Sequence, residues 1–154
     1  MSDTIQIFEI YIKAPPQKIW DAITSPEWTA KYGYQGRAEF DLRPGGVARH
    51  HANDEMVQMG LPAVIIDGEV LEAVPPNRLV TTHRWLFSEE NKAEGFTRIT
   101  WEIVLTTAGF CKVTITHDVA GAIVSDFSEQ GGGGWAWILS DMKSLLETGA
   151  AMGG

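Results

Sequence analysis

The chain has 154 residues, a formal net charge of −8 and a single cysteine. Its length favours a single domain, residues 1–154, with a core of its own. The negative charge argues against nucleic acid as a partner, and no apolar run approaches the roughly 18 residues that a membrane-spanning helix needs. Because Cys111 has no second cysteine to pair with and the first residues lack the pattern of a signal peptide, we expect a cytoplasmic protein without membrane insertion.

The first part of the chain predicts one strand and two short helices. Residues 4–13 alternate loosely and are rich in Ile, Phe and Tyr, which is typical of a strand. Two prolines then introduce a helix over residues 17–24, since proline is favoured in the first helical turn. Ser25 and Pro26 mark the cap and the first position of a second helix, which ends before Gly33.

Six antiparallel strands are predicted in the middle of the chain, over residues 36–42, 47–52, 63–74, 78–87, 96–106 and 110–119. Pro44 and Gly45 stand where a type II turn requires them, between the first two of these strands. Residues 67–68, Asp-Gly, interrupt the third strand. They could form a hairpin turn, but a bulge is preferred because a hairpin would leave two very short strands. Residues 53–62 and 88–95 are predicted to be loops.

One long amphipathic helix is predicted at the end of the chain, over residues 133–147. Its apolar residues recur at steps of three and four: Trp135, Ile138, Leu139, Met142, Leu145 and Leu146. The polar residues, Asp141 among them, fall mostly on the opposite face. Ser128 or Gly131 is the candidate N-cap, and Gly149 is well placed to end the helix in a left-handed conformation.

This order of elements predicts an α+β fold, in which a curved antiparallel sheet of about seven strands wraps around a long C-terminal helix, with two short helices after the first strand. Six segments carry a resemblance to known proteins: IKAPPQKIWDAITSPEW (12–28), FDLRPGG (40–46), IDGEVLEAVPPNRLV (66–80), ITWEI (99–103), KVTITHD (112–118) and GGGGWAWILSDMKSLLE (131–147). They resemble the helix-grip superfamily of START-like domains, and within it the bacterial proteins similar to the activator of heat-shock-protein-90 ATPase.

The resemblance implies a hydrophobic cavity between the sheet and the last helix. It does not imply one chemistry, because members of the superfamily include lipid carriers, hormone receptors and cyclases. We do not carry chaperone activation over to this chain, since activators of this type usually have an additional N-terminal domain.

Three of the four histidines are expected to point into that cavity. Alternation along the predicted strands places His83 and His117 on the inward face, and the resemblance places His50 there as well. The plainer interpretation is that each is a core or rim histidine with its hydrogen bonds satisfied. The alternative is a cluster that orients a polar group or acts as an acid or base near neutral pH. The absence of HxH and HExxH spacings makes a metal site a weak hypothesis.

Aromatic side chains supply candidate pocket walls. Trp28 and Tyr32 lie on the second helix, which the resemblance places near the cavity mouth, whereas Trp101 and Trp135 are better explained as core. The candidate ligand-binding residues are Trp28, Tyr32, His50, His83, Trp85, Trp101, His117, Trp135, Leu139 and Met142. Trp137 lies off the apolar stripe of the last helix, so it would cover a neighbouring strand or contribute to a dimer contact.

The sequence leaves three functions open. The first is the binding of a small apolar or aromatic molecule, with no metal or cofactor and with a homodimer as one arrangement to test. The second is an enzyme of the cyclase, dehydratase or hydrolase kind, in which His83 or His117 is the general acid or base. The third is a co-chaperone-like interaction protein. A sealed or filled cavity would count against the first two.

Overall fold

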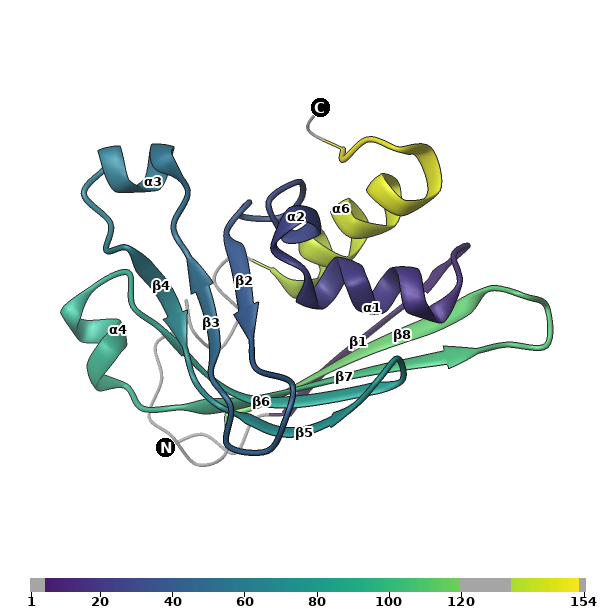
Figure 1. The fold of residues 1–154 in the computed structure, drawn as a ribbon, viewed down its shortest axis with the longest axis horizontal. Coiled ribbons are helices and arrows are strands. Elements are labelled where there is room, and N and C mark those ends of the chain that lie inside the picture. Colours follow the sequence, from purple (N-terminus) through teal and green to yellow (C-terminus); the bar gives the residue numbers. More distant parts are fainter. Residues whose placement is uncertain (1–4, 120–133, 153–154) are drawn as a thin grey trace.

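The computed structural model describes residues 5–119 and 134–152 of the chain (Figure 1). The strands are β1 (Ile5–Ile12), β2 (Arg37–Phe40), β3 (Ala48–His51), β4 (Val64–Asp67), β5 (Val70–Val74), β6 (Arg78–Trp85), β7 (Thr97–Leu105) and β8 (Cys111–Asp118). The helices are α1 (Pro16–Thr24), α2 (Pro26–Thr29), α3 (Asp54–Gln58), α4 (Glu89–Ala93) and α6 (Trp135–Thr148).

The strands form one eight-stranded antiparallel sheet in the order β1-β8-β7-β6-β4-β3-β2, and β5 also pairs with β6. The sheet bends strongly, so that β2, β3 and β4 rise beside α1, α2 and α6, which lie on its concave side (Figure 1). Helix α6 packs against β1, and α1 packs against β7. This is the predicted helix-grip α+β fold. The sheet has one strand more than the expected seven, because residues 63–74 form two strands.

The strands β4 and β5 belong to one interrupted strand. Both pair antiparallel with the same neighbour, β6. A side chain on Gly68 would place its Cβ 2.0 Å from the carbonyl oxygen of Thr82, so the interruption needs glycine to lie this close to β6. The chain therefore does not form a hairpin at residues 67–68. The predicted bulge lies further along than expected, because the register with β6 is kept from Asp67 to Val70 and shifts between Val70 and Glu72.

Two short helices lie where loops were predicted. Helix α3 falls within residues 53–62 and α4 within residues 88–95. Each begins with a capping side chain: Asn53 Oδ1 accepts from the Met56 amide, and Ser88 Oγ accepts from the Asn91 amide. Acidic residues follow both caps. These are ordinary helix-start signals, so the loop predictions were wrong because the two segments are short and lack an apolar stripe.

Helix α6 begins later than its predicted caps suggest. Gly134 occupies the N-cap position with φ +134°, a conformation that favours glycine, and Trp135 is the first helical residue. The predicted caps Ser128 and Gly131 are therefore wrong, and both lie outside the described residues. The other end is as predicted, because Gly149 ends the helix in the left-handed conformation with φ +89°.

Asp141 corrects the predicted polar face of α6. Its side chain is buried, and its two carboxylate oxygens accept from main-chain amides, Oδ2 from Gly33 at 2.7 Å and Oδ1 from Met152 at 2.8 Å. The carboxylate is satisfied by backbone donors, which is what allows a charged group to lie on a packed helix face.

The inward faces of the central strands are largely as alternation predicted. On β7, Ile99, Trp101 and Ile103 are buried, but Leu105 at the end of the strand is 57% exposed, although alternation turns it to the same side as these three. The strand runs past the helices that cover its middle (Figure 1). Among the described helices, none is long and apolar enough to cross a membrane.

Candidate functional site

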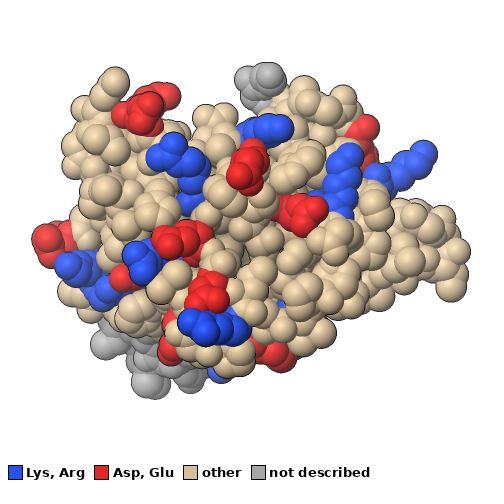
Figure 2. Space-filling view, viewed as in Figure 1, with Lys and Arg blue, Asp and Glu red and all other residues tan. Residues whose placement is uncertain are grey.

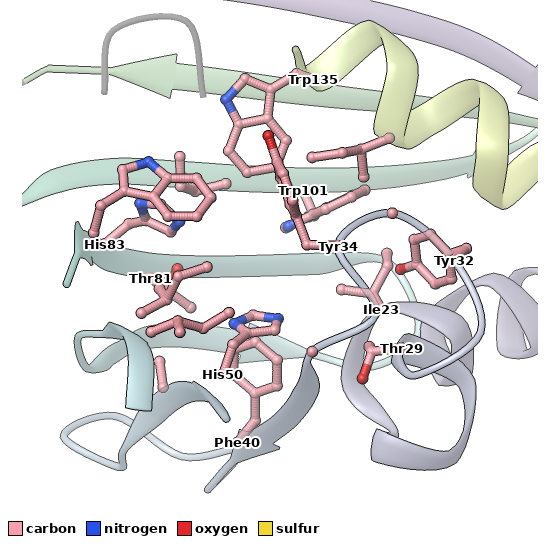
Figure 3. Close-up of a pocket in the computed structure, with 18 of the residues that line it drawn as sticks. Ile23, Thr29, Tyr32, Tyr34, Phe40, His50, Thr81, His83, Trp101 and Trp135 are labelled. Atoms are coloured by element: carbon pink, nitrogen blue, oxygen red, sulfur yellow. The ribbon is translucent and has the colours of Figure 1, made fainter. Parts of the chain in front are cut away.

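A pocket lies between the concave face of the sheet and the first turn of α6 (Figure 3). Its walls are mostly apolar: β6 and β7 contribute Trp85, Ile99 and Trp101, and α6 contributes Trp135 and Ile138. Its volume is about 90 Å³. An engineered apolar cavity of about 150 Å³ takes up benzene, so this pocket would have to widen to hold a molecule with a single ring.

The pocket brings together most of the residues predicted to bind a ligand. Those that line it are Tyr32, His50, His83, Trp85, Trp101 and Trp135. Those outside its lining are Trp28, His117, Leu139 and Met142. Leu139 and Met142 lie further along α6 and are buried in the hydrophobic core.

Only Trp28 lies on the second helix, because α2 ends at Thr29, before Tyr32. Trp28 is half-buried and packs against the hydrophobic core, and Lys31 Nζ lies 4.8 Å from the centre of its ring. Tyr32 turns inward instead and donates its hydroxyl hydrogen to the carbonyl oxygen of Ala22 at 2.7 Å. Only Tyr32 therefore reaches the pocket.

His117 is a structural histidine. Its Nε2 lies 3.0 Å from Thr97 Oγ1, and Trp135 Nε1 donates to its Nδ1 at 3.4 Å. Accepting from the indole requires an unprotonated Nδ1, so we assign the proton to Nε2, which donates to the Thr97 hydroxyl. Thr97 in turn donates to the main-chain carbonyl of His83 at 3.3 Å. The plainer interpretation made from the sequence fits this residue.

His50 and His83 are in a different situation. Neither imidazole makes a hydrogen bond within the part of the chain that the structure describes, and His50 Nδ1 is fully buried. The His83 ring packs against the ring of Trp85, with 5.2 Å between centroids, and the His50 ring meets Phe40 edge-on at 5.6 Å. In Figure 3 the two imidazoles lie on either side of Thr81. They are polar groups in an otherwise apolar pocket.

The pocket environment keeps both imidazoles neutral at neutral pH. Burial, with a smaller contribution from the nearby His51, lowers the pKa of His50 to about 4. Burial also holds the pKa of His83 well below its ordinary value, with smaller effects from His117 and His50. A neutral imidazole offers one N–H donor and one acceptor nitrogen.

We expect the protein to lose stability as the pH falls below about 6.5. The folded state binds a proton on His50 less readily than the unfolded state does, so the stabilisation is complete above the unfolded pKa and is lost as the pH falls toward 4. For His50 alone the loss at about pH 5 is up to about 2 kcal/mol, an upper limit because part of the ring is exposed. Urea unfolding near pH 7.5 and near pH 5 measures it.

The matched variants for this pH dependence are His50→Phe and His51→Phe. Removing His50 should flatten the dependence of unfolding free energy on pH. Removing the neighbouring His51, which is half-exposed and ion-paired with Glu39 at 2.8 Å, should leave most of it in place. An unchanged slope in His50→Phe would show that this imidazole does not titrate as its burial implies.

The loop between α2 and β2 forms one wall of the pocket, and of its residues only Tyr32 was predicted from the sequence. The Tyr34 ring lies edge-on to the rings of Trp85 and Trp137, with 5.6 Å between centroids in both pairs. Gly33 has φ +60° and is held by Asp141 of α6. Strand alternation cannot identify residues in such a loop. Trp137 is 44% exposed, and its ring packs against Tyr34 of this loop.

The described lining of the pocket is uncharged. Its described lining contains no Lys, Arg, Asp or Glu, and the described residues hold no group of three His, Cys, Asp or Glu that could bind a metal ion. Charged side chains of the pocket strands are paired outside its lining, as in Arg84 with Asp67 at 2.7 Å. Figure 2 shows Lys and Arg mixed with Asp and Glu over the face it presents, with no large patch of one sign.

Solved structures share this fold at low sequence identity. The Aha1 dimer from Colwellia psychrerythraea is 21% identical, with a TM-score of 0.68 over 95% of this chain and 98% of that chain. CalU16 from Micromonospora echinospora is 18% identical, with a TM-score of 0.65 over 94% and 77%. DynU16, from the dynemicin biosynthetic locus, is 19% identical, with a TM-score of 0.70 over 98% of this chain and 49% of its own.

Comparison with protein families matches residues 13–147 to the model of the Activator of Hsp90 ATPase homolog 1-like protein family. No curated protein sequence matches the chain. The matched range includes all the residues that line the pocket and nearly all of α6. By this match, the chain belongs to the Activator of Hsp90 ATPase homolog 1-like protein family.

Proposed function

We propose that this protein binds a small, mostly apolar or aromatic molecule in the pocket between the sheet and α6. The observation that carries the proposal is the pair of imidazoles, His50 and His83, which stand in an aromatic pocket without hydrogen-bond partners among the described residues. Buried polar groups are nearly always paired, so a bound molecule would complete this site.

The relatives support a role in small-molecule recognition. DynU16 comes from a biosynthetic locus and has the same fold. The described lining also lacks a carboxylate that could orient a catalytic imidazole, and the low pKa of His83 makes it a weak base. These features favour binding over acid–base catalysis.

Native mass spectrometry and a thermal-shift screen with small aromatic compounds test the proposal. A ligand present at about 100 times its dissociation constant adds about 2.7 kcal/mol of stability, which is a shift of several degrees for a domain of this size. The expected result is a bound molecule in the purified protein or a compound that raises the melting temperature.

A pair of alanine variants shows whether such a compound uses the pocket. Ala48→Leu adds three carbon atoms to the lining of a space of about 90 Å³, whereas Ala63→Leu adds the same atoms at an exposed position before β4. We expect Ala48→Leu to abolish the thermal shift and Ala63→Leu to keep it. A shift that persists in Ala48→Leu would place the compound elsewhere and count against the proposal.

A further inference from the structure

The side chains that line the pocket disfavour charged ligands. Its described lining holds no cation to pair with a carboxylate and no anion to pair with an amine. The nearest buried charge, Asp141, already accepts from the main-chain amides of Gly33 and Met152. Moving an ion from water into such a site is costly unless it is paired there. A molecule that fits this pocket is therefore uncharged.

The same lining also disfavours a purely apolar molecule. His83 and His50 line the pocket, and neither imidazole has a hydrogen-bond partner among the described residues. His50 Nδ1 is already fully buried, but covering the ring nitrogens that still reach water with hydrocarbon would remove that access without replacing it, which costs binding free energy. His117 does not need a polar ligand group, because both of its ring nitrogens are hydrogen-bonded, to Thr97 and Trp135.

The sheet fixes the spacing of the two imidazoles. His83 lies on β6 and His50 on β3, with β4 between them. His50 is paired with Ile66, and Ile66 with Trp85, two residues along β6 from His83. Two strand spacings and two residues along a strand separate the Cα atoms by about 12 Å. Both side chains line the pocket, with Thr81 between them, so a molecule lying there can meet one imidazole at each end (Figure 3).

We propose that the ligand is an uncharged compound with a single aromatic ring and a hydrogen-bonding group at each end, one bound by His83 and the other by His50. The proposal rests on the function proposed above and names the chemical class that the site selects. The aromatic walls, Trp85 and Trp101 among them, contact the ring. The volume of about 90 Å³ excludes compounds with more than one ring, and the pocket must widen to admit a single substituted ring.

Four compounds of matched shape test this selection by isothermal titration near pH 7.5. They are 4-hydroxybenzyl alcohol with two neutral polar groups, p-cresol with one, p-xylene with none, and 4-hydroxybenzoate with a negative charge. We expect 4-hydroxybenzyl alcohol to bind about five- to tenfold more tightly than p-cresol, as one extra hydrogen bond allows. We expect 4-hydroxybenzoate to bind more weakly than both.

Substitutions of the two histidines test whether each imidazole binds one polar group of the ligand. His83→Phe and His50→Phe should each reduce the affinity for 4-hydroxybenzyl alcohol to that of p-cresol, while p-xylene binding is kept. His83→Gln keeps a donor and an acceptor and should restore part of the affinity. His51→Phe is the control, because His51 is half-exposed and ion-paired with Glu39. Thermal unfolding of each variant confirms that it is folded.

The outcomes separate the two proposals. Binding of p-xylene or p-cresol as tight as that of 4-hydroxybenzyl alcohol, or tightest binding of 4-hydroxybenzoate, would overturn the ligand class and leave a binding pocket. Loss of p-xylene binding in the Ala48→Leu variant would confirm that the probes occupy this pocket. Failure of all four compounds to bind the wild-type protein would overturn both proposals.

Discussion

Replacing Trp135 with alanine is expected to lower the free energy of unfolding by about 3–5 kcal/mol, the usual cost of removing a buried aromatic side chain. The indole is 6% exposed and lies at the start of α6, where it packs edge-on against Trp101 with 6.2 Å between centroids. Its N–H also donates to His117 Nδ1. The variant would therefore lose packing and leave the imidazole nitrogen without its donor.

The melting temperature measures this effect, and a loss of roughly 6–20 °C is expected for a chain of this length. Trp137→Ala is the matched control, because Trp137 stands on the same helix but is 44% exposed. It should cost no more than about 1 kcal/mol, the range of one aromatic pair. Near-normal unfolding of Trp135→Ala would mean that α6 presents a different face to the sheet.

The fold was predictable because the sheet repeats a simple rule. Alternation identified His83 and His117 as inward-facing, and both are buried, while the three- and four-residue steps identified the buried face of α6. Alternation failed at Leu105, which is exposed because it lies beyond the helices that cover the middle of β7. The helical pattern failed at Asp141. It assigns a charged residue to the exposed face, and it cannot show that this carboxylate accepts hydrogen bonds from main-chain amides far away in the sequence.

The site was predictable only in part, for the same reason. Alternation turned His83 and His117 to the same side, yet one lines the pocket and the other is bonded within the core. The difference depends on where Thr97 and Trp135 fall in three dimensions. Tyr34 lies in a loop, where no periodic pattern exists, and its place in the pocket wall depends on the anchoring of Gly33 to α6.

Asp141, which holds Gly33 to α6, is the second residue whose replacement should have a large effect. Asp141→Ala is expected to lower the free energy of unfolding by about 3–5 kcal/mol. One carboxylate holds two segments to α6, the pocket loop through the Gly33 amide and the C-terminal residues through the Met152 amide. Hydrogen bonds to a charged group are worth about 1.5–3 kcal/mol each, and their loss leaves part-buried N–H groups unpaired. Ligand affinity should fall as well, because the loop that carries Tyr34 loses its attachment.

Asp141→Asn distinguishes loss of the anchor from a general packing defect. The amide has nearly the same shape but one acceptor oxygen, so it can hold only one of the two main-chain amides, and its NH2 group faces the other. We expect about half the loss of stability seen for Asp141→Ala, measured by urea unfolding, and faster hydrogen exchange of either the Gly33 or the Met152 amide. Ser140→Ala, the neighbouring position, should change stability by no more than about 0.5 kcal/mol. If Asp141→Asn were as stable as the wild type, the carboxylate would not be what fastens the pocket loop to α6.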